Sequence, residues 1–188
     1  PVFSTIHGLG YRIILDYSRL KSIDYKLIEQ GDSQQNKYRI LKEIYRKYNH
    51  HPISDERLES LINALGVLAN EGLSPDELAN NMSIDIPSFP EIVDTYKEYK
   101  QRHKLLDFDD MLTLSFSILK HNPYLREKYR KKFAFIQVDE GQDTSRIQMQ
   151  LLGILAAPKF NFAFAVFFLI FGRIGIHLIH IGLRNTSV

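Results

Sequence analysis

The spacing of apolar residues along the chain predicts helices through most of its length. Apolar positions three and four residues apart indicate a helix over residues 6–17 and another over 38–48. A third helix is expected to begin after Ser54, which can cap it, and to end at Gly72. Further helices are predicted to start at Ser74 and to cover residues 92–104, 107–119, 124–131 and 144–155.

Short extended segments interrupt this helical pattern. Residues 2–5 are compatible with a strand, and residues 25–28 form an isolated extended piece. Residues 133–138 are mostly apolar and β-favouring, which predicts a buried strand, and Thr144 is expected to cap the helix that follows. Another strand is expected over residues 161–166. This order suits a helical insertion within an open α/β sheet, where ligands gather at the carboxyl ends of strands.

Composition limits the class of protein. The 188 residues are 44% apolar and 24% charged, which fits a folded domain with or without a subdomain. The sequence has no cysteine, which excludes disulfides and thiolate metal sites and fits a reducing cytoplasm.

The net charge of +2 hides an uneven distribution. Three basic residues and no acidic ones follow residue 158, which leaves 21 basic against 22 acidic residues before it. Residues 1–158 are therefore nearly neutral, and nucleic-acid binding would have to come from individually placed side chains.

An acidic pair, Asp139 and Glu140, stands where the predicted strand 133–138 ends. In nucleotide hydrolysis an Asp at such a position can hold Mg²⁺, and a neighbouring Glu can polarise the attacking water. The amide of Gln142, two residues on, could then sense the phosphate. From these residues alone, solvated turn residues or helix-start acids favoured by the helix dipole remain an equal alternative.

Residues 136–144, Ile-Gln-Val-Asp-Glu-Gly-Gln-Asp-Thr, resemble the second helicase motif of superfamily 1 DNA helicases of the UvrD/PcrA/Rep type. The family pattern is an apolar strand, Asp-Glu, usually an aromatic residue, and then Gln-Asp. Gly141 departs from it, since the family commonly has Phe or another large residue there. A glycine removes packing beneath the site and loosens the backbone without moving the two carboxylates.

Two earlier segments carry the same resemblance. Thr5 and His7 are similar to the family's Thr-x-His motif, in which both side chains face single-stranded DNA, although Gly8 replaces the usual Ser. Residues 107–112, Asp-Phe-Asp-Asp-Met-Leu, resemble the segment that precedes the second helicase motif. Three acids in the first turn of a helix are also what the helix dipole favours, and we interpret them as structural.

The resemblance implies a fold and an activity. The expected fold is α/β but predominantly helical, part of a RecA-like P-loop NTPase motor domain with a helical accessory subdomain inserted. Its boundaries are residues 1–15 and 105–166 for the motor domain, 16–104 for the accessory subdomain, and 167–188 for an apolar tail outside the family pattern. The implied activity is ATP- and Mg²⁺-dependent translocation on single-stranded DNA in the 3′-to-5′ direction, with unwinding of duplex DNA.

The implied roles rest on few residues: Asp139 holds magnesium, Glu140 activates water, Gln142 couples the ATP state to DNA, and Thr5 and His7 contact the single strand. The phosphate loop Gly-x-x-x-x-Gly-Lys-Ser/Thr does not occur in the chain, and the resemblance places it before Pro1. We therefore expect negligible ATPase activity from the chain by itself. The alternative is a non-catalytic helical DNA-binding or adaptor module.

Two further stretches allow more than one interpretation. Residues 96–104 interleave tyrosines with basic residues, which fits either a DNA-contacting face or an amphipathic helix whose tyrosines are half-buried. Residues 160–171 are almost continuously apolar, but Arg173, His177 and His180 follow, so we expect no stable membrane insertion.

Overall fold

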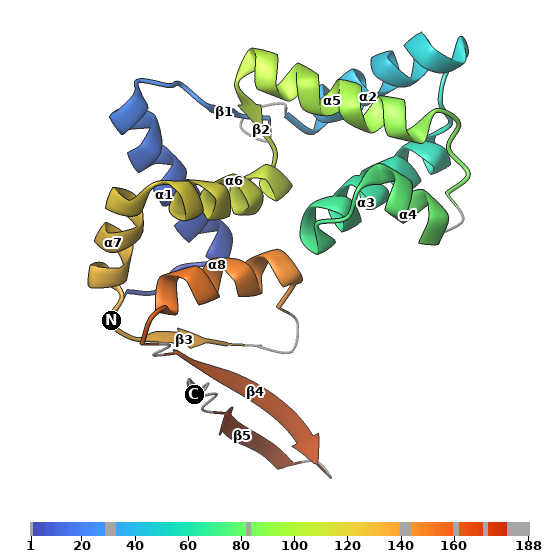
Figure 1. Ribbon diagram of the computed structural model, residues 1–188. Helices are drawn as coiled ribbons and strands as arrows, with labels where there is room; N and C mark the ends of the chain where they lie inside the picture. Colours follow the sequence, from blue (N-terminus) through green and yellow to red (C-terminus); the bar gives the residue numbers. More distant parts are fainter. Residues whose placement is uncertain are drawn as a thin grey trace, which may run out of the picture.

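The computed structural model describes residues 2–28, 33–81, 84–139, 144–159, 162–170 and 173–179. Helices make up most of these residues, and the strands are few and mainly short (Figure 1). The helices are α1 (Ile6–Lys21), α2 (Ser33–Asn49), α3 (Asp55–Glu71), α4 (Pro75–Asn81), α5 (Phe89–His103), α6 (Phe108–His121), α7 (Pro123–Lys132) and α8 (Arg146–Ala156). The strands are β1 (Lys26–Leu27), β2 (Leu105–Leu106), β3 (Ile136–Val138), β4 (Phe162–Ile170) and β5 (Arg173–Ile179).

Capping residues set several helix ends where the sequence predicts them. The Ser54 hydroxyl accepts from the backbone N–H of Arg57 at the start of α3, and Gly72 ends that helix at φ 66°. Ser74 and Glu77 form reciprocal side-chain to backbone bonds at the start of α4. These local signals explain why the predicted helices are confirmed.

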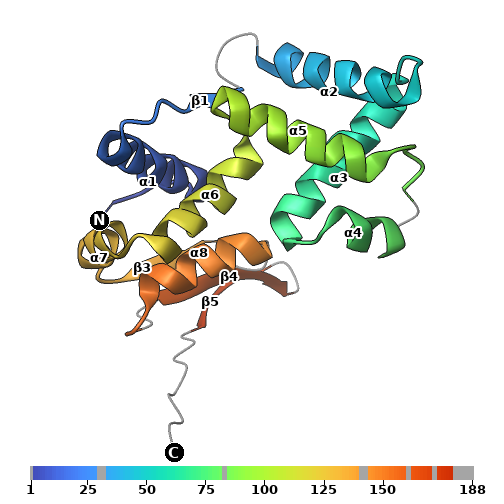
Figure 2. The same cartoon turned by 45° about the horizontal axis from the view of Figure 1, so that its top comes forward.

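Two hydrophobic cores divide the helices. The first core consists of buried side chains from Ile28 to Tyr96, supplied chiefly by α2 to α5. The second core joins Ile13 and Ile14 of α1 to α6, α7 and α8. Figure 2 shows the two groups of helices side by side, with α5 and α6 meeting where the groups join. The short parallel pair β1–β2 lies at the same junction.

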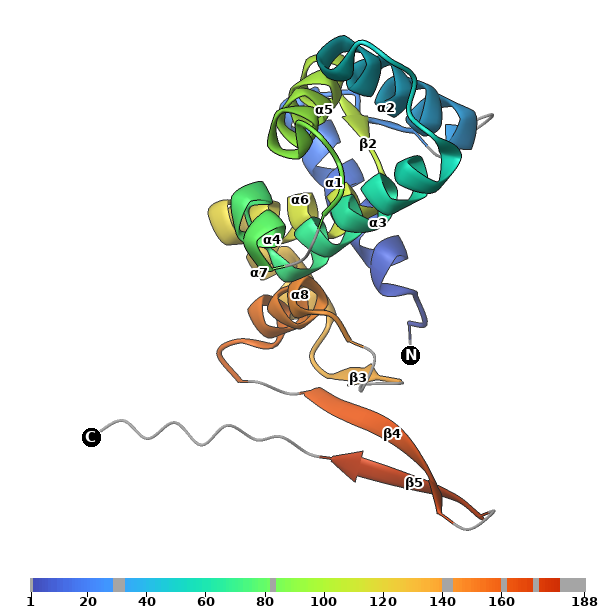
Figure 3. The same cartoon turned by 90° about the vertical axis from the view of Figure 1, so that its right-hand side faces the viewer.

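The sheet beside the second core is small. β3 pairs with β4 in parallel, and β4 pairs with β5 in an antiparallel hairpin that extends away from the helices (Figure 3). None of the helices that the structure describes is long and apolar enough to cross a membrane.

The structure corrects three local predictions. Residues 2–5 are not a strand, although they run beside β3 across a cavity. The expected buried strand 133–138 shortens to Ile136–Val138 and is not buried, since Phe135 is 55% exposed and β4 is the single strand paired with β3 among the described residues. Ser145, not Thr144, is the N-cap of α8, because Gln148 stands three residues beyond Ser145 and its side chain accepts from the Ser145 N–H.

Candidate functional site

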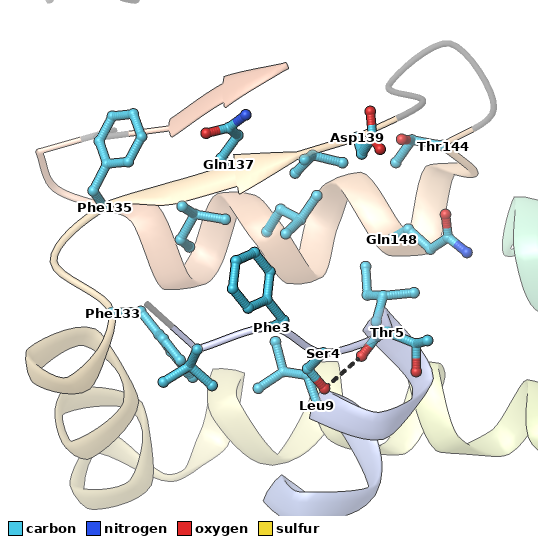
Figure 4. A pocket seen from close by; sticks show the side chains of 15 residues that line it. Phe3, Ser4, Thr5, Leu9, Phe133, Phe135, Gln137, Asp139, Thr144 and Gln148 are labelled. Atoms are coloured by element: carbon cyan, nitrogen blue, oxygen red, sulfur yellow. Dashed lines mark hydrogen bonds between the residues drawn. The ribbon is translucent and has the colours of Figure 1, made fainter. Parts of the chain in front are cut away.

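An open cavity of about 750 Å³ separates the N-terminal segment from β3 and α8 (Figure 4). Its walls are mainly apolar, and polar side chains gather at the end where β3 terminates. That end of a strand is where open α/β sheets bind their ligands. The lining residues are Val2, Phe3, Ser4, Thr5, Ile6, Leu9, Phe133, Phe135, Ile136, Gln137, Val138, Asp139, Thr144, Gln148 and Leu152.

Thr5 belongs to this cavity and also starts α1. Its Oγ1 accepts from the backbone N–H of Gly8 at 3.1 Å, so the side chain is the N-cap of the helix. A hydroxyl can donate while it accepts, so the cap does not use up its hydrogen-bonding capacity. A Cβ at Gly8 would lie 3.1 Å from both Ser4 Oγ and Thr5 Oγ1, which explains why glycine suits this version of the helix start.

His7 lies in the first turn of α1, outside the cavity lining. Its ring contacts the ring of Phe108 in an edge-to-face arrangement, with centroids 6.2 Å apart and planes at 85°. Phe108 is the first residue of α6 and remains 52% exposed. The sequence analysis assigns no DNA contact to Phe108, although an aromatic residue inside an acidic helix start is a usable signal.

Asp139 follows β3 and is exposed at the polar end of the cavity. Figure 4 places it beside Thr144, with Gln148 and Thr5 on the facing side. The structure therefore brings Thr5 and Asp139, which are far apart in the sequence, to one cavity. Glu140, Gln142 and Gly141 lie outside the described residues.

The donor set around Asp139 is compatible with magnesium but not with a closed metal site. No group of three or more His, Cys, Asp or Glu side chains that could hold a metal occurs in the described part of the chain. Mg²⁺ commonly takes one or two protein carboxylates and completes its shell with water and substrate phosphates. A single described carboxylate at a strand end fits that mode.

Comparison with known proteins identifies the family. The sequence pattern of the UvrD/REP helicase N-terminal domain matches residues 1–172. The chain belongs to this family. The match extends beyond Val166, where the resemblance to the helicase motifs ends, as far as residue 172.

Individual relatives agree with the family match. The chain is 31% identical over 161 residues to the ATP-dependent DNA helicase Rep of Buchnera aphidicola subsp. Baizongia pistaciae (strain Bp), covering 85% of the chain and 23% of that protein. It is 30% identical over 160 residues to the ATP-dependent DNA helicase PcrA of Staphylococcus epidermidis, covering 81% of the chain and 21% of that protein. The chain thus spans less than a quarter of the length of these relatives.

The acidic segment of this UvrD/REP-type domain, residues 107–110, has a structural role. Asp107 Oδ1 accepts from the Asp110 N–H and Asp110 Oδ2 accepts from the Asp107 N–H, each at 2.9 Å, which makes a capping box for α6. Lys100 Nζ lies 2.9 Å from Asp107 Oδ2 and 2.7 Å from Asp110 Oδ2. These carboxylates therefore hold a helix start within the protein.

The carboxylates of Asp107 and Asp110 have pKa values shifted in opposite directions. Burial opposes ionisation of Asp107, but Lys100 and Lys37 outweigh it and hold the pKa of Asp107 well below its usual range. Burial and the Asp107 charge raise the pKa of Asp110 to about 6. Two carboxylates that share one ammonium group cannot both be fully stabilised in the charged form.

Two residues of the basic and aromatic stripe on α5, Tyr96 and Lys100, have structural roles. Tyr96 is buried in the first core, and Lys100 is buried against the acidic segment. The Tyr96 hydroxyl donates to Asp107 Oδ2 at 3.2 Å. Of the two interpretations left open by the sequence, the amphipathic helix accounts for these two residues, because neither is accessible to DNA.

Proposed function

We propose that this chain forms part of the motor domain of an ATP-dependent DNA helicase. Its family membership and its similarity to the ATP-dependent DNA helicases Rep and PcrA support this class of activity. The observation that carries the proposal is the cavity that Thr5 and Asp139 both line. For ATP turnover to change the affinity for DNA, the start of α1, which would face DNA, and the end of β3, which would face magnesium, would have to lie close together.

The proposed domains follow the two cores, except that α1 continues past residue 15 to Lys21 and β4 continues past residue 166 to Ile170. Residues 1–15 and 105–166 would form a RecA-like motor portion around the second core. Residues 16–104 would form the helical accessory subdomain around the first core. Residues 167–188 would be a separate tail, although the first six of them still fall within the family match.

In the nucleotide site, Asp139 would hold the Mg²⁺ ion that neutralises phosphate charge when ATP is bound. Glu140 would polarise the attacking water, and Gln142 would couple the state of the nucleotide to the grip on DNA. The chain contains no phosphate loop, so little would hold a triphosphate, and we expect negligible ATPase activity from these 188 residues. A DNA-stimulated ATPase that Glu140→Gln abolishes would contradict this expectation.

On the DNA side, Thr5 and His7 would contact the phosphates of a single strand at the start of α1. The exposed ring of Phe108 extends this surface and offers a face on which a base could stack. Translocation in the 3′-to-5′ direction and unwinding of duplex DNA are further parts of the proposal.

Fluorescence anisotropy with a labelled oligo-dT strand tests the DNA surface. We expect salt-dependent binding that weakens about tenfold when both Thr5 and His7 are changed to Ala, since two phosphate contacts are lost. Thr5→Ala also removes a helix cap, so Ser54→Ala, which removes the equivalent cap of α3, is the matched control and should leave the affinity unchanged. Equal losses in both cap variants would show that capping, not DNA contact, explains the result.

A further inference from the structure

A buried ion network joins the first core to the start of α6. Lys100, in the last turn of α5, has a side chain that is 10% exposed and contacts both carboxylates of the α6 capping box. Lys37 of α2 lies 3.6 Å from Asp107 Oδ2 and 4.0 Å from Asp109 Oδ2. Both lysines belong to helices of the first core, while α6 belongs to the second. The network therefore crosses the junction between the two cores.

Lys100 acts on the same atoms that shape the first turn of α6. Asp110 Oδ2 receives both the Asp107 N–H and the Lys100 ammonium group. Asp107 uses one oxygen to cap the Asp110 N–H and the other to accept from Lys100 and Tyr96. A displacement of the Lys100 side chain would thus change the bonding of both capping residues.

The first turn of α6 carries Phe108 between the capping residues. Its ring meets the ring of His7, and Gly10 allows α1 and α6 to approach closely on the same side. A Cβ at Gly10 would lie 3.0 Å from the carbonyl oxygen of Met111. A chain of direct contacts therefore runs from Lys100 through the capping box to Phe108 and His7.

We propose that Lys100 is a positioning residue, which orients the first turn of α6 so that Phe108 and His7 form the single-strand surface. This inference rests on the proposed function. A buried ion pair contributes little net stability compared with apolar packing, and fixing one geometry is a better reason to keep it. The proposed accessory subdomain would in this way set the shape of the DNA surface without touching DNA at this point.

Two measurements on the 188-residue chain test the role of Lys100. Oligo-dT affinity reports the surface, and fluorine NMR of para-fluorophenylalanine placed at position 108 reports the orientation of the ring. Lys100→Met should keep the chain folded, shift the fluorine signal and weaken oligo-dT binding about tenfold. Lys100→Arg keeps the charge and two or more donors, so it should restore most of the affinity.

Lys42→Met is the matched control. Lys42 lies on α2, another helix of the first core, and pairs with Asp55 at 3.0 Å, but at an exposed position. It should change neither measurement. A folded Lys100→Met chain with an unchanged fluorine signal and unchanged affinity would overturn the proposal. So would a loss that Lys42→Met reproduces.

If Lys100→Met does not fold, Asp110→Asn replaces it, because the amide oxygen can still accept from the Asp107 N–H while the charge that Lys100 binds is lost. It should shift the fluorine signal and weaken binding about threefold; no change in either would overturn the proposal. If the wild-type chain fails to bind oligo-dT, the proposed function fails. The fluorine signal of the Lys100 variants then decides the positioning role by itself, with a shift supporting it and no shift overturning it.

Discussion

Two acidic stretches of this chain look alike in sequence but differ in their surroundings. At the start of α6, the Asp107 side chain is 3% exposed, and its oxygens accept from Lys100, Tyr96 and the Asp110 N–H. At the end of β3, Asp139 is exposed beside a cavity of about 750 Å³. Both stretches stand at the start or end of a secondary-structure element and both combine neighbouring acids with an amide or aromatic residue.

The difference shows how to separate structural from functional carboxylates. The protein itself fills the hydrogen-bonding capacity of Asp107, so a ligand has no access to that group. Asp139 instead lies where an incoming phosphate and its metal ion would be found in an open α/β sheet. Removing Asp107 should therefore cost stability, whereas removing Asp139 should cost little stability.

The largest expected effect is that of Asp107→Ala. The substitution leaves the buried ammonium group of Lys100 with one carboxylate partner fewer and removes the α6 cap. We expect a loss of about 3–5 kcal/mol in the free energy of unfolding, measured by urea denaturation. Asp55→Ala is the control, because Asp55 also pairs with a lysine but its side chain is 91% exposed, and its loss should stay below about 1 kcal/mol. Equal losses would contradict the distinction.

Gly10→Val tests how far the tightly packed region extends toward His7. A side chain at Gly10 would press on the Met111 carbonyl oxygen and on Ser115 Oγ, at 3.0 and 3.2 Å from the Cβ. We expect a loss of about 1–3 kcal/mol, measured by thermal or urea unfolding. Gly66→Val is the matched control in α3. A Cβ there would meet no atom within 4 Å apart from its chain neighbours and the nearby backbone of its own helix, and the change in stability should be about 0.5 kcal/mol or less.

Local signals in the sequence predict the helices well. Ser54, Gly72, Ser74 and Glu77 fix helix ends through bonds to residues three or four positions away, so their effect is visible in a short window. The strand prediction for residues 2–5 failed because a strand requires a partner from a distant segment. The described structure gives these residues a cavity beside β3 and no hydrogen-bonded neighbour strand.

For the candidate site, too, local motifs were predictable from the sequence and contacts between distant segments were not. The helicase motifs selected Thr5, His7 and Asp139 through the resemblance, and the structure places Thr5 and Asp139 at one cavity. The sequence did not predict the tertiary contacts of Lys100. Lys100 looks like a basic residue on a helix surface until its distance to the α6 capping box is known. Periodicity reveals which residues share a face of a helix but not what that face meets.

The pH dependence of the free energy of unfolding tests the difference in pKa between Asp107 and Asp110. Burial and Asp107 raise the pKa of Asp110 to about 6. A raised pKa in the folded state means that folding favours the protonated form, so stability falls as pH rises from about 4 to about 6. Relative to Asp110→Asn, which does not titrate, the wild-type chain should lose about 1–2 kcal/mol over this range.

Urea unfolding of both chains at several pH values provides the measurement. Groups that do not interact with Asp110 titrate alike in both chains and cancel in the difference. Asp107 and Lys100 interact with it directly, so their response to the substitution is part of the measured difference. A difference that is flat with pH would show that Asp110 titrates near its ordinary value. A difference of opposite slope would place the shared proton on another group.

The smallest expected effect is that of Asp139→Asn, and it completes the comparison because Asp107→Asn is its isosteric counterpart. Asp139 is exposed, so we expect its replacement to change the free energy of unfolding by less than about 1 kcal/mol. Oligo-dT affinity should be unchanged, since the proposed DNA contacts are made by other residues. If Asp139→Asn instead destabilises the chain as much as Asp107→Asn, the Asp139 carboxylate has a structural role. Its exposure at a cavity would then be no evidence for a functional role.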